Sequence, residues 1–287
     1  MQFKSFFPVL FGVLVAGCAS QLNFVEHKPS GLLVLADQSA VFSAKGLGVH
    51  IDKVKEKNSK VVVYAHGGGG LTTTDRARIS MMKNLGFDAV YFDSFYMNRL
   101  DPVWANRNLT DSSKQDLIRN VFIGAYEYAL EQAQYSEIVF YGQSNGARVV
   151  LSVLNQLDPN PRLKLVLSEG PASGGNNLPD AVDVPTYLFY GLKDNWGGSG
   201  EGDLMFTRVT RGMAGSNADW VGRLRQKRSP VNAISYPNSG HDFFWGGLTP
   251  VTRVMRFGTT TGYLGSSSED REKYRSDIQW ITGKYVK

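Results

Sequence analysis

Ser144 lies in a sequence context that predicts a nucleophile. It is the central residue of Gly142-Gln-Ser-Asn-Gly146. The apolar run 137–141 before it has the character of a buried strand, and residues 147–157 after it have that of a helix. A serine on such a tight turn projects its oxygen above the sheet edge, and the helix N-terminus favours an anion nearby. The alternative is a glycine-rich turn with an unused serine.

A serine hydroxyl becomes a good nucleophile when a base removes its proton, and the chain has four histidines. We expect His241 to be the base because it follows the last predicted strand, residues 233–236, on a loop facing Ser144. The alternative is a loop histidine with structural hydrogen bonds. His27 and His50 lie in early irregular segments. We interpret His66 as a residue that shapes a glycine-rich loop.

The base needs a carboxylate that orients its ring and stabilises the imidazolium. Asp194 is the expected partner, because it follows a buried strand, residues 186–190, and a glycine. Its alternative role is to start a turn into the loop that follows. The rival acids are Glu169, Glu201 and Asp203. Asp242 is adjacent to His241 and is poorly placed to reach the far side of its ring.

An attacked carbonyl also needs donors for its developing negative charge. One donor is expected to be the backbone N–H of Asn145, directly after the nucleophile. The other is expected from the glycine run at residues 66–70, where amides can approach a ligand without side-chain interference. Gly68 is the favoured donor of this run, and Gly69 is the alternative.

The central part of the chain alternates apolar strand-like runs with helix-like segments, which favours an α/β fold with a mostly parallel sheet and helices on both faces. The predicted strands are 60–65, 87–92, 138–141, 163–167, 186–190 and 233–236. The predicted helices are 75–85, 112–134, 147–157 and 268–281. Ser266 and Glu269 have the spacing of a capping box for the last helix.

Taken together, these motifs resemble the α/β-hydrolase superfamily over roughly residues 60–285, and within it the dienelactone-hydrolase-type branch. The resemblance rests on Tyr64-Ala-His-Gly-Gly-Gly-Gly-Leu71, Tyr91-Phe-Asp-Ser-Phe95, the Ser144 pentapeptide, Tyr190-Gly-Leu-Lys-Asp194 and Gly240-His-Asp-Phe243. True dienelactone hydrolases carry cysteine at the nucleophile, whereas this chain has Ser144. The resemblance therefore implies an α/β-hydrolase fold and a Ser-His-Asp hydrolase of carboxylic esters that needs no cofactor.

Two other functions stay open on the sequence. The same three residues could support acyl transfer or the hydrolysis of short peptides, and the chain could be a non-catalytic envelope-binding lipoprotein on a hydrolase scaffold. Metal-ligand spacing is absent, because the chain has one cysteine and no His-x-x-x-His pair. The formal charge of +5 is mild and its basic residues form no recognisable module, so nucleic-acid binding is not expected.

The N-terminal segment predicts export and a lipid anchor. A lysine-containing start is followed by the apolar residues 6–16, which are short for a membrane span. Leu14-Val-Ala-Gly-Cys18 then resembles the lipobox of bacterial lipoproteins, which implies removal of residues 1–17 and lipidation of Cys18. The alternatives are an ordinary signal peptide and an uncleaved membrane helix.

Ala19, rather than aspartate, follows the cysteine, and this favours the outer membrane of a Gram-negative cell, with the protein facing the periplasm. We expect residues 18–30 to be a tether and residues 31–287 to form a single α/β-hydrolase domain. The sequence predicts a small-molecule ester as partner, and it leaves the oligomeric state open.

Overall fold

The computed structural model describes residues 49–287 except residues 56, 172–177, 195–216 and 256–257. The predicted signal segment, Cys18 and the tether therefore lie outside the described residues, as do the rival acids Glu201 and Asp203. The other residues predicted for the site lie inside. No helix among the described residues has the length and apolar character needed to cross a membrane.

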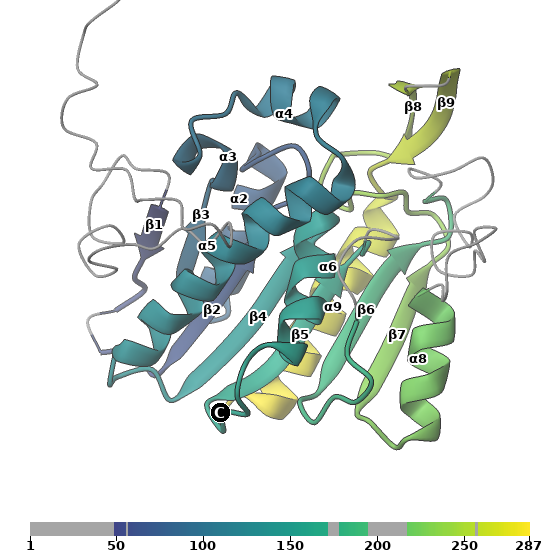
Figure 1. The fold of residues 1–287 in the computed structure, drawn as a ribbon. Coiled ribbons are helices and arrows are strands. Elements are labelled where there is room, and N and C mark those ends of the chain that lie inside the picture. The colour runs from purple at the N-terminus through teal and green to yellow at the C-terminus, as the bar shows by residue number, and fades with distance from the viewer. Residues whose placement is uncertain (1–48, 56, 172–177, 195–216, 256–257) are drawn as a thin grey trace, which may run out of the picture.

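A seven-stranded sheet with the order β1-β3-β2-β4-β5-β6-β7 forms the centre of the structure (Figure 1). β1 pairs antiparallel with β3, and the other neighbouring strands pair in parallel. The strands are β1 (Val49–Asp52), β2 (Lys60–Ala65), β3 (Asp88–Phe92), β4 (Glu137–Gln143), β5 (Leu163–Glu169), β6 (Thr186–Gly191) and β7 (Val231–Tyr236). This confirms the predicted, mostly parallel sheet.

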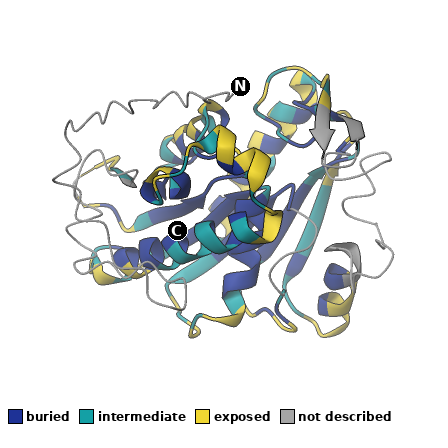
Figure 2. Cartoon of the chain, turned by 45° about the horizontal axis from the view of Figure 1, so that its top comes forward, coloured by how far each residue is buried: buried dark blue, intermediate teal, exposed yellow. Residues whose placement is uncertain are grey.

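Helices cover both faces of the sheet because its strands are apolar on both sides. On β2, Val61 and Val63 pack in one core with α5, α6 and α8, whereas Val62 and Tyr64 pack in a second core with α2 and α9. Figure 2 shows the strands as the most buried part of the molecule. The helices are α2 (Thr73–Asn84), α5 (Asp111–Glu131), α6 (Asn145–Ser152), α8 (Asn217–Gln226) and α9 (Ser268–Tyr285), and the short 3₁₀ helix η1 (Val153–Asn155) follows α6.

Several connections carry elements that the sequence did not predict. Two short helices, α3 (Ser94–Met97) and α4 (Pro102–Asn108), follow β3, and an antiparallel hairpin of β8 (Thr249–Met255) and β9 (Gly258–Leu264) follows β7. Both insertions lie at the top of Figure 1, beyond the carboxyl ends of the strands that precede them. β1 was also missed.

The predicted capping box of the last helix was wrong by one residue. The N-cap of α9 is Ser267, whose side chain accepts a hydrogen bond from the Asp270 backbone N–H. The Ser266 hydroxyl instead donates to the backbone oxygen of Phe243 at 2.8 Å. Ser266 therefore ties the start of α9 to the segment after His241.

Candidate active site

Ser144 occupies a strained turn between β4 and α6. Its φ of 54° and ψ of −114° lie where residues other than glycine are uncommon. The turn also needs glycine on each side: a Cβ at Gly142 would lie 2.4 Å from the Gly146 oxygen, and a Cβ at Gly146 would lie 2.2 Å from the Ala65 oxygen. The pentapeptide thus has the strand–turn–helix geometry that its sequence predicted.

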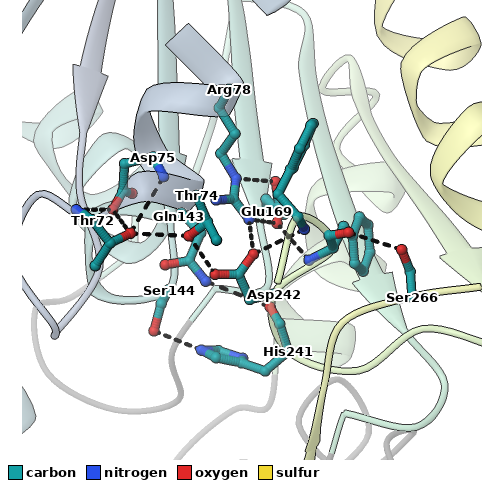
Figure 3. A network of polar contacts seen from close by, with 12 residues as sticks. Thr72, Thr74, Asp75, Arg78, Gln143, Ser144, Glu169, His241, Asp242 and Ser266 are labelled. Atoms are coloured by element: carbon teal, nitrogen blue, oxygen red, sulfur yellow. Dashed lines mark hydrogen bonds and ion pairs between the residues drawn. The ribbon is translucent and has the colours of Figure 1, made fainter. Parts of the chain in front are cut away.

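His241 lies between Ser144 and Asp194. Its Nε2 is 2.8 Å from the Ser144 Oγ, and its Nδ1 is 2.8 Å from the Asp194 Oδ2. His241 and Asp194 are almost completely buried, with 5% and 1% of their surfaces exposed, whereas Ser144 is half-buried. Figure 3 shows the imidazole directed at the Ser144 oxygen. The structure therefore brings together the three side chains that the sequence placed on separate loops.

The hydrogen bonds of His241 determine its tautomer. An ionised carboxylate can only accept hydrogen bonds, so Nδ1 carries the proton and donates a hydrogen bond to Asp194. Nε2 of the neutral ring is then an acceptor for the Ser144 hydroxyl proton. This is the orientation in which an imidazole can act as a general base on Ser144.

Close backbone contacts hold the loops that carry Asp194 and His241. The Lys193 N–H donates to the Ser239 oxygen at 2.9 Å, and a Cβ on Gly191 would lie 2.1 Å from that same oxygen. The His241 N–H donates at 2.9 Å to the oxygen of Tyr263, in β9. The hairpin that the sequence missed therefore supports the histidine loop.

The glycine run lies against the Ser144 turn. A Cβ on Gly67 would lie 2.2 Å from the Gln143 side-chain oxygen, and one on Gly68 would lie 2.8 Å from the Asn145 side-chain nitrogen. A Cβ on Gly69 would instead contact Thr72, at 3.6 Å. Judged by these Cβ distances, Gly68 lies closer to the Ser144 turn than Gly69 does. Gly67 also lies beside this turn, and the sequence did not single it out as a donor.

Asn145 is the first residue of α6, where backbone N–H groups have no acceptor within the helix. Its side chain is held by α5: the Gln115 amide donates to its oxygen at 3.0 Å, and its own amide donates to Asp111 at 3.2 Å. The side chain of Asn145 also lies beside the glycine run, since a Cβ on Gly68 would lie 2.8 Å from its amide nitrogen.

His66 contacts the glycine loop and does not reach Ser144. It is fully buried, its Nε2 accepts the Ser94 backbone N–H at 3.0 Å, and its Nδ1 lies 2.7 Å from the Gly67 oxygen. Because Nε2 is an acceptor, Nδ1 carries the proton and donates to Gly67. These contacts fit the predicted role of His66 in shaping the loop.

The rival acid Glu169 and the neighbouring Asp242 bind a common arginine. Glu169 and Asp242 both form ion pairs with Arg78, and Asp242 also accepts from the Thr74 hydroxyl at 2.7 Å (Figure 3). Burial by itself raises the pKa of Asp242, but the Arg78 charge and the Thr74 hydrogen bond outweigh it and hold that pKa below its usual value. Asp194 is the acid that contacts the imidazole of His241.

Tyr141 and Tyr274 complete this cluster as neutral donors. Their hydroxyls donate to the Glu169 carboxylate at 3.0 and 2.8 Å. Burial, followed by the negative charge of Glu169, raises the pKa of both tyrosines well above the usual value. The described residues include no group of three or more His, Cys, Asp and Glu side chains that could hold a metal ion.

Comparisons of structure place this chain among known α/β-hydrolase structures. The dienelactone hydrolase of Anabaena variabilis superposes with a TM-score of 0.56 and 14% identity, over 83% of this chain and 92% of that one. Est1E of Butyrivibrio proteoclasticus, in a structure with ferulic acid bound, gives 0.53 and 11%, over 83% and 94%. An esterase of Pyrococcus furiosus gives 0.53 and 12%, over 80% and 83%.

No protein-family model matches the sequence, and neither does any curated protein. At these low identities the structural likeness shows the fold. The chain has the α/β-hydrolase fold, with a mostly parallel central sheet and helices on both faces.

Proposed function

We propose that this protein is a serine hydrolase that cleaves carboxylic esters through an acyl-enzyme. The observation that carries the proposal is the position of the His241 ring, which lies 2.8 Å from Ser144 on one side and 2.8 Å from Asp194 on the other. Nucleophile, base and orienting acid in one hydrogen-bonded series are the parts that acyl transfer to serine requires.

In the first half-reaction, the Ser144 oxygen attacks the ester carbonyl while Nε2 of His241 accepts its proton. Asp194 stabilises the resulting imidazolium and keeps its ring in place. The backbone N–H groups of Asn145 and Gly68 donate to the oxyanion of the tetrahedral intermediate. When this intermediate collapses, the alcohol leaves with the proton from His241, and the acyl group stays on Ser144.

In the second half-reaction, His241 accepts a proton from water, and the resulting hydroxide attacks the acyl carbonyl. The same two N–H groups stabilise the second oxyanion. Collapse releases the carboxylic acid, and His241 returns its proton to Ser144. All proton transfers pass through one imidazole, and the reaction as written uses no cofactor.

The first test replaces the nucleophile. Ser144→Ala is expected to lower the turnover of a p-nitrophenyl ester by at least about 10⁴-fold, because no oxygen remains to form the acyl-enzyme. The urea unfolding midpoint should change little, since only a half-buried hydroxyl is lost. Steady-state kinetics and urea titration measure both. Full ester turnover by the purified variant would refute the assignment.

Acyl transfer and short-peptide hydrolysis are the alternatives on the same residues. All three reactions pass through an acylated Ser144, so product analysis must separate them. We expect the free carboxylic acid to be the main product in water, with no faster release of p-nitrophenol when an alcohol or amine acceptor is added. Preferential formation of a new ester or amide would assign a transferase instead.

We propose in addition that the enzyme is a lipoprotein. The support for this is the sequence Leu14-Val-Ala-Gly-Cys18 after an apolar segment. Acyl chains on the sulfur and on the new amino group of Cys18 would anchor it stably, as more than one chain is needed for stable attachment. The predicted location is the outer membrane, facing the periplasm.

A further inference from the structure

Arg78, on α2, connects two segments of the candidate active site. Its side chain is fully buried. Its Nε donates to the Glu169 Oε2 at 2.7 Å and its Nη2 donates to the Asp242 Oδ1 at 2.6 Å (Figure 3). Nη2 also donates to the second carboxylate oxygen of Glu169. One guanidinium thus bridges the end of β5 and the segment that carries His241.

Glu169 supports both sides of the reacting pair. Its backbone oxygen accepts the N–H of Ser144 at 2.9 Å, which fixes the strained turn. Its carboxylate accepts the N–H of Phe243, two residues after His241, at 3.4 Å. The orientation of this one carboxylate, set by the fork of Arg78, therefore affects the position of the His241 segment relative to Ser144.

Asp242 also holds the segment that carries His241. Besides Arg78, its carboxylate accepts the Thr74 hydroxyl at 2.7 Å and the N–H of Phe244 at 2.9 Å. Its neighbour His241 has its backbone oxygen 3.5 Å from the Gln143 amide nitrogen. His241 and the two residues after it are thereby attached to β4, α2 and β5.

Burying these three charged groups costs free energy, so a gain in stability does not by itself explain the cluster. One cation and two carboxylates lose most of their hydration, and buried ion clusters often add no net stability compared with apolar packing. The Nη1 of Arg78 also has no hydrogen-bond acceptor among the described residues. Directional hydrogen bonds to two carboxylates offer geometric control that apolar packing lacks.

We propose that Arg78 is a positioning residue for catalysis, which holds the His241 segment at the distance from Ser144 that proton transfer requires. This inference rests on the proposed function. Arg78 acts through Glu169 and Asp242 and does not touch the reacting atoms. The planar fork of arginine makes the two contacts together, whereas the ammonium of lysine is a point charge on a flexible stem.

The expected change in kcat follows from a displacement of the His241 segment relative to Ser144. A displacement of about 1 Å in a catalytic group can lower a rate by about 100-fold. Arg78→Lys and Asp242→Asn are therefore expected to lower kcat for p-nitrophenyl acetate by about 10- to 100-fold. KM should stay within about twofold, because neither residue is proposed to contact the substrate. In Arg78→Ala, added guanidinium should restore part of kcat, whereas the same concentration of sodium chloride should not.

Asp88→Asn is the matched control for lost stability. Asp88 is also a fully buried carboxylate, and it accepts from Asn58 and Tyr135, both at 2.9 Å. It is the first residue of β3, at the end of the sheet away from Ser144. Asp88→Asn is expected to lower the urea midpoint and to leave kcat unchanged. If the Arg78 variants lose activity only in proportion to their fraction of unfolded protein, the inference is overturned.

A readout independent of turnover separates this inference from the proposed function. The proton between His241 and Asp194 should give a downfield NMR resonance, identified by its loss in His241→Gln. We expect Arg78→Lys and Asp242→Asn to shift or broaden this resonance and Asp88→Asn to preserve it. If the native protein hydrolyses no ester but the resonance responds in this way, the proposed function fails and the positioning role stands. If the resonance and kcat are both unchanged in Arg78→Lys and Asp242→Asn, the positioning role fails.

Discussion

Both ring nitrogens of His241 have a hydrogen-bond partner, and the two partners, Ser144 and Asp194, have different proposed roles. In the proposed mechanism, Ser144 keeps its proton until it attacks. Its hydroxyl therefore donates a hydrogen bond to Nε2 of the neutral ring. In the same mechanism, Asp194, which has 1% of its surface exposed, orients the ring before and after proton transfer. The nucleophile and the acid are therefore expected to respond differently to conservative substitution.

The role of Asp194 is tested by Asp194→Asn. The amide has nearly the same shape, but its NH₂ group can donate to Nδ1 and so favour the tautomer with the proton on Nε2. That tautomer cannot accept the proton of Ser144. We expect kcat to fall by about 10³–10⁴-fold in kinetics on a p-nitrophenyl ester at neutral pH. Glu169→Gln does not alter the acceptor on Nδ1 and should cost less; the opposite order of effects would contradict the assignment of the acid.

Residue types and chain order were sufficient to predict that Ser144, Asp194 and His241 lie close together, because each follows a predicted strand on a parallel sheet. No sequence pattern predicted the Arg78 cluster. Arg78 and Glu169 are 91 positions apart, and arginine on a helix is normally expected to be solvated. Glu169 was a rival acid in the sequence analysis. Its contact with Arg78 depends on the packing of α2 against the end of β5, which no local sequence pattern shows.

At the scale of elements, the Ser144 turn depends on the close approach of α6 to β2. Gly146 is in the first turn of α6, and its Cα lies against the backbone oxygens of Ala65 and His66. This contact also places the glycine run beside Asn145. In the proposed mechanism, the tight packing of strand and helix thus serves the oxyanion site as well as the fold.

Gly146→Ala is expected to destabilise the protein by about 3 kcal/mol and to lower kcat, because the new methyl group would lie 2.2 Å from the Ala65 oxygen. Gly222→Ala in α8 is the matched control, since a Cβ there meets nothing within 4 Å. It should stabilise the protein by about 0.5–1 kcal/mol and leave kcat unchanged. Urea unfolding and kinetics test both variants, and equal stability effects would contradict this account.

Strands β2 to β7 and helices α2, α5, α6 and α9 could be predicted because their apolar patterns extend over many residues. β8, β9, α3 and α4 could not, for reasons that differ among them. The α3 helix has four residues and α4 has seven, too few for a periodic pattern, and both begin at aspartate caps that also suit turns. β8 contains two threonines and a proline, β9 is rich in threonine and glycine, and the two strands pair with each other outside the main sheet.

At the scale of the whole molecule, the parallel sheet brings together residues that are distant in the chain. Ser144 and His241 are 97 positions apart, and each follows a strand whose carboxyl end lies at the same edge. Such a site forms only when the sheet is complete. We propose that residues 31–287 act as a single domain, so that ester turnover and secondary structure should be lost in one cooperative transition on unfolding.

The proposed lipid anchor belongs to the same scale, because it decides where the enzyme meets its substrate. In Gram-negative cells supplied with labelled palmitate, the native protein is expected to take up label, and Cys18→Ala is not, because it lacks the acceptor sulfur. Ser144→Ala should be labelled like the native protein. Gel electrophoresis with detection of the label measures this, and equal labelling of Cys18→Ala would rule out Cys18 as the lipidated residue.

The central claim, an activated Ser144, is tested most directly by a fluorophosphonate. The folded native protein should gain the mass of one phosphonyl group, and peptide mapping should locate it on Ser144. His241→Gln should react far more slowly although its serine is intact, since its base is gone. No adduct on the folded native protein, or an adduct on a different serine, would contradict the account.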